Sequence, residues 1–247
     1  MKILGIIPAR FASTRFPGKP LIDLAGKTMI QRVYEQAKMA SSLTEVIVAT
    51  DDQRIFDVVE LFGGKAIFTS DKHQSGTDRC AEVAEKTLGF DAVINIQGDE
   101  PLINPVQIDL VASCFDNDQT QLATLVKIIK SEEDLFNFNT PKVILNKNLE
   151  AIYFSRQTIP YLNNIDTKNY LQHHTFYKHV GIYGYQTETL LQIAKLPIGK
   201  LEKAEILEQL RWIENGYKIK VAVTEHETLA IDNLNDVEKI LAVLREI

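Results

Sequence analysis

The chain of 247 residues has little cysteine, no long apolar run and no excess of positive charge. Its two cysteines, Cys80 and Cys114, form neither a CxxC pair nor a Cys/His cluster, which argues against a disulfide framework or a zinc site and fits a reducing cytosol. The net charge of −6 disfavours a non-specific nucleic-acid binder. No apolar stretch is long enough for a bilayer, and the start lacks the pattern of a signal peptide. We therefore expect a cytoplasmic protein with no nucleic-acid partner and no membrane partner.

The first apolar segment, residues 2–7, is short and rich in isoleucine, as is typical of a parallel strand that is covered on both faces. No G-x-G-x-x-G pattern follows it, which disfavours a dinucleotide oxidoreductase. The loop that does follow carries three cations, Arg10, Arg15 and Lys19. Ligands of open α/β sheets bind beyond the carboxyl ends of the strands, so this loop predicts a ligand rich in anionic oxygen, with a polyphosphate as the first choice.

The first half of the chain alternates strand and helix patterns, which predicts βαβ units and a parallel sheet. The expected strands are residues 2–7, 45–50, 65–68 and 92–96, and the expected helices are 28–39, 52–62 and 78–88. We expect a single domain over residues 1–247, of the α/β class, with a Rossmann-like, mostly parallel sheet flanked by helices.

The middle of the chain has closely spaced strand patterns at residues 121–130, 142–146 and 151–154 without a long helix between them. This predicts an antiparallel, smaller β-rich lobe inserted within about residues 120–190. Residues 161–177 are polar and predict a long loop, and residues 180–185 predict a strand. The last part predicts an amphipathic helix at 203–214, a strand at 218–223 and a helix at 236–245.

An acidic motif, Gln97-Gly98-Asp99-Glu100, follows the expected strand 92–96 directly. A carboxylate at a strand end is well placed to hold Mg²⁺, which prefers oxygen ligands from one or two carboxylates and a phosphate. A plain turn, in which Gly98 supplies the bend and Asp99 caps it, is the other interpretation. The cationic loop after the first strand favours the metal interpretation.

A third segment, Gln74 to Arg79 with the sequence QSGTDR, opens the expected helix 78–88. Ser75, Gly76 and Thr77 are good capping residues, which explains the helix start. The same geometry directs backbone N–H groups at a polar ligand, and Arg79 beside them is not needed for a cap. From this segment alone, both interpretations remain open.

Six segments together resemble the sugar-nucleotide cytidylyltransferases, and within them the branch that activates 3-deoxy-manno-octulosonate (Kdo). In chain order they are PARFASTRFPGKPL (8–21), QSGTDR (74–79), INIQGDEP (94–101), YFSR (153–156), KHVGIYGY (178–185) and LEQLR (207–211). The resemblance covers nearly the whole chain. It implies the fold of the nucleotide-diphospho-sugar transferases, transfer of CMP from CTP to the anomeric hydroxyl of Kdo for lipopolysaccharide synthesis, Mg²⁺ as cofactor, and a homodimer that forms through the central lobe.

Two other functions are compatible with parts of the pattern. One is CMP transfer to another acidic sugar, such as a sialate or 8-amino-Kdo; the HxGIYGY and LEQLR segments argue against the sialate. The other is a nucleotide-sensing scaffold without turnover, which loss of Asp99, Lys19 or Asp232 would favour, yet all three are present.

The resemblance also implies the roles of individual residues. Catalysis would depend on Arg10, Lys19, Asp99 and Asp232, and the two aspartates would hold the metal. CTP would contact Pro8, Ala9, Arg10, Ser13, Thr14, Arg15, Lys19, Ser75, Gly76, Thr77, Arg79, Gln97 and Gly98.

The sugar acid, with its carboxylate and several hydroxyls, would contact Gln97, Arg156, His179, Tyr183, Glu208 and Gln209. From spacing alone, His179 fits a structural histidine and Tyr183 a strand aromatic. Spacing likewise places Glu208 and Gln209 on the solvent face of helix 203–214, so that the resemblance is the only reason to put them in a site. The sequence shows no dedicated general base, and we do not assign His179 that role.

Overall fold

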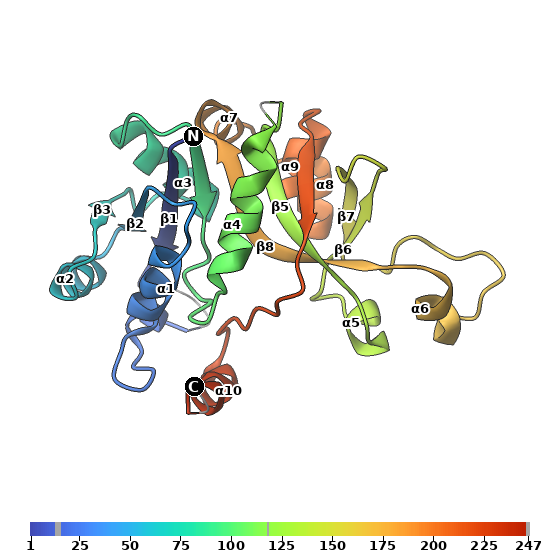
Figure 1. Ribbon diagram of the computed structural model, residues 1–247, viewed down its shortest axis with the longest axis horizontal. Helices are drawn as coiled ribbons and strands as arrows, with labels where there is room; N and C mark the ends of the chain where they lie inside the picture. The colour runs from blue at the N-terminus through green and yellow to red at the C-terminus, as the bar shows by residue number, and fades with distance from the viewer. Residues whose placement is uncertain (13–15, 118, 246–247) are drawn as a thin grey trace.

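The computed structural model describes residues 1–12, 16–117 and 119–245, and a mixed sheet of nine strands with helices on both faces forms its centre (Figure 1). Along the sheet the order is β3-β2-β1-β4-β8-β5-β9, and β6 and β7 pair beside β8. The strands are β1 (Ile3–Ala9), β2 (Glu45–Thr50), β3 (Ala66–Phe68), β4 (Ala92–Asn95), β5 (Leu122–Ile128), β6 (Lys142–Leu145), β7 (Ala151–Ser155), β8 (Tyr177–Gln186) and β9 (Ile219–Val223).

The α-helices are α1 (Met29–Lys38), α2 (Gln53–Leu61), α3 (Gly76–Lys86), α4 (Pro105–Ser113), α5 (Glu132–Phe136), α6 (Tyr170–His173), α7 (Thr187–Ile193), α8 (Lys200–Glu205), α9 (Gln209–Glu214) and α10 (Leu234–Leu244). Side chains that the sequence placed at helix starts cap several of them: Thr28, Asp52 and Ser75 accept hydrogen bonds from the first turns of α1, α2 and α3.

The predicted fold class is confirmed by the strand pairing. β1 pairs in parallel with β2 and β4, and β2 pairs in parallel with β3. β8 is antiparallel to both β4 and β5, so it joins this parallel half to the parallel pair β5 and β9. The three β-strands predicted in the middle of the chain therefore remain within the same sheet.

The core lies on both faces of the sheet because successive side chains of a strand point to opposite sides. In β1, Ile3 and Ile7 pack with α1, α2 and α4, whereas Leu4 and Ile6 pack with α3, α7 and α9. All four are buried. This double burial explains why the strand reads as a continuous apolar run.

Residues 161–177 were predicted to be a loop, and this is wrong in part. They contain a short 3-10 helix, Thr167–Asn169, and α6. Tyr170 and Phe176 are buried and stack at 5.8 Å, in a small apolar cluster with Ile129 and Leu135. The polar composition concealed this cluster, because its partners are Ile129, which directly follows β5, and Leu135 of α5. In Figure 1 the segment extends away from the main sheet beyond β6 and β7.

The single helix predicted at residues 203–214 is also wrong, since α8 and α9 are separate helices. Ile206 ends α8 in the left-handed conformation, with φ of 54°. Arg211 of α9 then binds Glu202 of α8 through two hydrogen bonds of 2.6 and 2.7 Å, which holds the two helices together across the break. As a result Gln209 is buried rather than on the predicted solvent face, and Glu208 is half-buried.

Helices α4, α5 and α7 were not predicted. In addition, β8 begins at Tyr177, three residues before the predicted strand. No helix in the described part of the chain is long and apolar enough to cross a bilayer.

A close contact in β8 allows a test of the packing between the sheet and α4. A Cβ atom at Gly184 would lie 2.6 Å from the ring of Phe115 and 2.7 Å from Val111, whereas a Cβ at Gly181 of the same strand would meet no atom within 4 Å. We expect Gly184→Ala to lower the free energy of unfolding by about 1–3 kcal/mol through overpacking. Gly181→Ala is the matched control. Equal urea midpoints for the two variants would contradict the packing described.

Candidate functional site: a pocket at the carboxyl ends of β1 and β4

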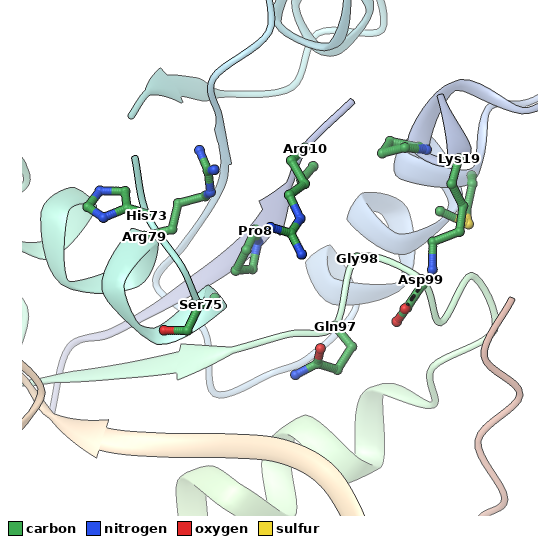
Figure 2. Close-up of a pocket in the computed structure, with 13 residues that line it drawn as sticks. Pro8, Arg10, Lys19, His73, Ser75, Arg79, Gln97, Gly98 and Asp99 are labelled. Carbon is green, nitrogen blue, oxygen red and sulfur yellow. Dashed lines mark hydrogen bonds and ion pairs between the residues drawn. The ribbon is translucent and has the colours of Figure 1, made fainter. Parts of the chain in front are cut away.

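One pocket lies where β1 and β4 end and α3 begins (Figure 2). This is the edge of a parallel sheet at which ligands bind. Ten of the residues proposed from the sequence line it: Pro8, Ala9, Arg10, Lys19, Ser75, Gly76, Arg79, Gln97, Gly98 and Asp99. Pro20, Met29 and His73 line it as well. The three predicted motifs therefore meet in one place. Ser13, Thr14 and Arg15 lie outside the described residues.

Gly98 allows the loop after β4 to approach the loop after β1. A Cβ atom at this position would lie 2.6 Å from the carbonyl oxygen of Pro8. Any larger residue would therefore separate the two loops. This close approach sets the position of Asp99, which is the next residue.

Lys19 connects three segments at one end of the pocket. Its ammonium group donates to Asp99 Oδ2 at 2.8 Å and to the carbonyl oxygen of Ile231 at 2.7 Å. The backbone N–H of Ile231 in turn donates to the carbonyl oxygen of Asp99 at 2.9 Å. The Lys19 side chain is 15% exposed, so this cation is largely removed from solvent.

Asp232 comes directly after Ile231 and lies one residue beyond the contact with Asp99. It is exposed and is not among the lining residues of the pocket. The residue that caps α10 is Asn233, whose side chain accepts from the backbone of Asn235.

Glu100 differs from its neighbour Asp99 in being buried. Burial, and secondly the charge of Asp99, raise the pKa of Glu100 to about 8. It is therefore mostly protonated at neutral pH, which leaves Asp99 as the carboxylate that carries the charge at this end of the pocket.

The opposite end of the pocket is built on the start of α3. Ser75 and Asp78 form a capping box, in which each side chain accepts a hydrogen bond from the other residue's backbone. Arg79 is nearly fully buried, and it is held by Asp51 at 2.8 Å and by Thr69. Figure 2 shows Arg10 between this end and the Lys19–Asp99 pair.

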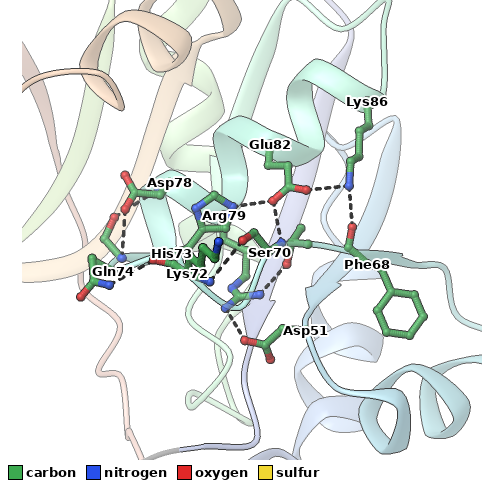
Figure 3. A network of polar contacts seen from close by, with 12 residues as sticks. Asp51, Phe68, Ser70, Lys72, His73, Gln74, Asp78, Arg79, Glu82 and Lys86 are labelled. Carbon is green, nitrogen blue, oxygen red and sulfur yellow. Dashed lines mark hydrogen bonds and ion pairs between the residues drawn. The ribbon is translucent and has the colours of Figure 1, made fainter.

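His73 is a pocket residue that the sequence analysis missed. Its Nε2 contacts Glu82, and the same Glu82 carboxylate accepts from Lys86 and from the backbone of Ser70 (Figure 3). In the sequence, its position just before QSGTDR was the signal that could have placed it in the pocket. Its contact with Glu82, nine residues further along the chain, is visible in the structure alone.

A second group of predicted residues lies outside the lining of the pocket: Thr77, Tyr183 and Gln209, which are buried, and Glu208, which is half-buried. The Thr77 hydroxyl donates to Glu208 Oε2 at 2.8 Å. Burial raises the pKa of Glu208, although the hydrogen bond from Thr77 opposes this. The rings of Tyr183 and Trp212 pack edge to face, with their centroids 5.0 Å apart. Burial raises the pKa of Tyr183, and the nearby Glu208 carboxylate raises it further.

Some polar atoms of this buried group have no partner within the described residues. They include the hydroxyl of Tyr183 and the Nε2 of Gln209. Buried polar atoms are normally hydrogen-bonded, and an exception needs an explanation. A polar ligand is such an explanation. Gln97 links this group to the pocket, since its Nε2 donates to the carbonyl oxygen of Gly181 in β8 at 2.7 Å.

His179 lies beside Tyr183 on β8, with ring centroids 5.2 Å apart. Its Nε2 is 3.0 Å from the Thr124 hydroxyl. Burial lowers the pKa of His179 to about 3, so the ring is neutral at physiological pH. So low a pKa makes the ring a weak base, which agrees with the decision not to assign His179 the role of general base.

Arg156 makes its contacts elsewhere. Its guanidinium donates to the carbonyl oxygens of Glu205, Ile206 and Phe138. Among the described residues, these hydrogen bonds lead to no other sugar-site candidate. The buried Lys142 ammonium holds the carbonyl oxygen of Arg156 at 2.7 Å. The structure thus does not bring Arg156 into direct contact with Tyr183, Glu208 or Gln209.

A mixed sheet with a pocket of cations and a carboxylate at the carboxyl ends of β1 and β4 suits the binding of a nucleotide, as in the nucleotidyltransferases. The family model for cytidylyltransferases matches residues 4–219, and the chain belongs to this family. The chain is 57% identical to the 3-deoxy-manno-octulosonate cytidylyltransferase of Parabacteroides distasonis, over 99% of this chain and 98% of that protein. It is 56% identical to the enzyme of the same name from Bacteroides thetaiotaomicron, over 96% of each.

Among solved structures, a CMP:2-keto-3-deoxy-manno-octonic acid synthetase complexed with CTP superposes with a TM-score of 0.93. The two sequences are 41% identical, and the match covers 100% of this chain and 99% of that one. The fold and the family expected from the sequence are therefore both confirmed.

The network around His73 predicts a pH dependence of stability. Burial opposes ionisation of Glu82, but hydrogen bonds from Lys86, Ser70 and His73 lower its pKa from 4.5 to about 2. The folded state therefore gains stability from this carboxylate above pH 4.5, and the gain is lost as the pH falls from 4.5 toward 2.

Glu82→Gln should lower the free energy of unfolding by about 1–3 kcal/mol at pH 7. The difference from wild type should shrink in urea titrations at pH 4 and below. Glu85→Gln changes an exposed carboxylate of the same helix and serves as the control. A difference for Glu82→Gln that stays constant from pH 7 to pH 3.5 would be inconsistent with the lowered pKa.

Proposed function

We propose that the protein joins CTP and Kdo: the anomeric hydroxyl of the sugar attacks the α-phosphorus of CTP, CMP-Kdo forms and pyrophosphate leaves. The observation that carries the proposal is the pocket in which Lys19, Arg10 and Asp99 face the capped start of α3. Relatives that are 57% and 56% identical over nearly the full chain carry the name of this activity. The similar solved structure holds CTP.

The two ends of the pocket suit the two parts of CTP. The triphosphate would lie at the end of Lys19 and Arg10, because a lysine ammonium suits a phosphate as a point charge and a guanidinium can bind it bidentately. The nucleoside would lie at the end of Ser75 and Arg79, where backbone N–H groups of α3 are available. Ser13, Thr14 and Arg15 join the triphosphate site by the family resemblance.

Phosphoryl-type transfer needs alignment and charge neutralisation more than covalent help from the protein. The pocket offers this through its cations, while Gly98 and Pro8 keep the two loops in contact. Lys19 neutralises Asp99 in the structure.

Asp99 and Asp232 fit a Mg²⁺ ion that is shared with the nucleotide. Among the described residues no group of three acidic, histidine or cysteine side chains is arranged to hold a metal, so an all-protein site is not formed there. Two carboxylates on segments joined by the Ile231–Asp99 hydrogen bond match the way proteins usually hold Mg²⁺, with phosphate oxygens as further ligands. When bound, the metal would screen the phosphate charge and lower the pKa of the attacking hydroxyl.

The sugar acid would occupy the region of Gln97, Tyr183, Glu208 and Gln209, where buried polar atoms lack partners in the described structure. Kdo has many hydroxyl groups, and these can satisfy both donors and acceptors. His179 is neutral and lies beside Tyr183, so it contributes a hydrogen-bonding ring and no charge. Arg156 remains the proposed partner of the sugar carboxylate, on the resemblance alone.

The lobe within residues 120–190 is the proposed contact of a homodimer, again from the resemblance. It exposes the large apolar side chains of Phe138, Ile152 and Tyr161. Light scattering should give twice the mass of the 27.9 kDa chain. A monomer mass would contradict this part of the proposal.

The activity is measured as pyrophosphate release from CTP, Mg²⁺ and a sugar acid. We expect release with Kdo, and none from Asp99→Asn, which keeps the side-chain size but removes the charge that holds the metal. Circular dichroism checks that this control variant is folded. Release with 8-amino-Kdo and none with Kdo would overturn the substrate, and no release with any acidic sugar would overturn the enzyme class.

A further inference from the structure

Residues 224–233 connect β9 to α10 without forming a helix or strand. We call this segment the C-terminal strap. In Figure 1 it runs as an extended trace from β9, past the lower end of α4, to α10. It also lines a cavity together with Leu102 and Ile103, through Glu227 and Leu229. The strap therefore crosses from the sheet to the nucleotide pocket along the surface of the protein.

The first part of the strap is fixed to β5 and β8 by charge. Glu227 accepts from the ammonium groups of Lys127 on β5 and Lys178 on β8, the latter at 2.5 Å. Lys178 also donates to Asp134 of α5 at 3.0 Å. These four charges form a network, and Lys178 is the direct neighbour of His179.

The last part of the strap is fixed to the nucleotide pocket. Ile231 is fully buried in a cluster with Leu24, Met29 and Ile240. Its backbone carbonyl and N–H bind Lys19 and Asp99 respectively, as described above. The position of Lys19 therefore depends on where the strap places Ile231.

Only three residues lie between Glu227 and Ile231, so the four Cα–Cα steps that join them can span at most about 14 Å when fully extended. The connection is short, so a shift of the strap at Glu227 would be expected to move the carbonyl group that holds Lys19.

We propose that Glu227 is a positioning residue for nucleotide binding: through the strap it holds the Ile231 carbonyl where it orients Lys19 toward the triphosphate. This inference rests on the proposed function, since it concerns the same CTP site. Glu227 itself lines no part of the nucleotide pocket, so its effect is indirect.

A purely structural role for Glu227 has a different signature. Its side chain is 50% exposed, whereas the side chains of its partners Lys127 and Lys178 are 17% and 16% exposed. If the ion pairs only supported the fold, loss of the charge would lower the melting temperature and leave CTP affinity unchanged. The positioning role predicts instead that CTP affinity falls.

The test is a calorimetric titration of Mg·CTP into wild type and Glu227→Gln at low salt. We expect the dissociation constant of the variant to rise about three- to tenfold. The difference in dissociation constant between the variant and wild type should narrow in 0.5 M salt, because salt screens the ion pairs of Glu227. Glu45→Gln is the matched control, because Glu45 on β2 also forms an ion pair with a lysine, Lys65, and lies outside the strap.

Unchanged CTP affinity in Glu227→Gln, or the same weakening in Glu45→Gln, would overturn the positioning role. The wild-type assay separates this from failure of the proposed function. If wild type binds Mg·CTP and releases pyrophosphate with Kdo, and Glu227→Gln binds Mg·CTP with the same affinity, only the inference on the strap is wrong. A wild type that binds no CTP would overturn both.

Discussion

The Lys19 ammonium is the point on which the site depends. It is largely shielded from water and binds a carboxylate from the loop after β4 and a carbonyl from the segment before α10. The loop after β1, the acidic motif and the end of the chain are therefore held together by one cation. Each of these segments comes from a different part of the sequence, and each supplies a group that the proposed reaction needs.

The arrangement of the sheet explains how the two proposed substrate regions become adjacent. β4 leads into the loop of Gln97 and Asp99, and β8 carries His179 and Tyr183. The two strands pair antiparallel, with Asn95 opposite Tyr183. The end of β4 therefore lies between the pocket proposed for the nucleotide and the buried polar group, which suits a reaction that joins two substrates.

Local sequence predicted the parts of this structure that local physics determines. β1 reads as a strand because both faces are buried, and the start of α3 reads as a cap because Ser75 and Asp78 satisfy each other's backbone. The meeting of the three motifs was implied by the resemblance; two of them, the loop after β1 and the acidic motif after β4, follow parallel strands whose carboxyl ends share an edge. The individual roles of the site residues came from resemblance, not from spacing.

What the sequence could not predict depends on distant partners. The break at Ile206 depends on a left-handed residue and on the Arg211–Glu202 pair, so a continuous helical pattern was misleading. The place of His73 in the pocket depends on Glu82, and the depth of Tyr170 depends on Leu135.

The central claim is that Lys19 holds the triphosphate, and Lys19→Met tests it most directly because methionine keeps most of the side-chain length without the charge. The measurement is kcat/KM for CTP in the pyrophosphate assay, with Lys27→Met as control; Lys27 is an exposed lysine paired with Glu35 on the nearby surface. The account predicts a loss of about 100-fold or more for Lys19→Met, and near wild-type activity for the control. A Lys19→Met variant that is folded and as active as wild type would contradict it.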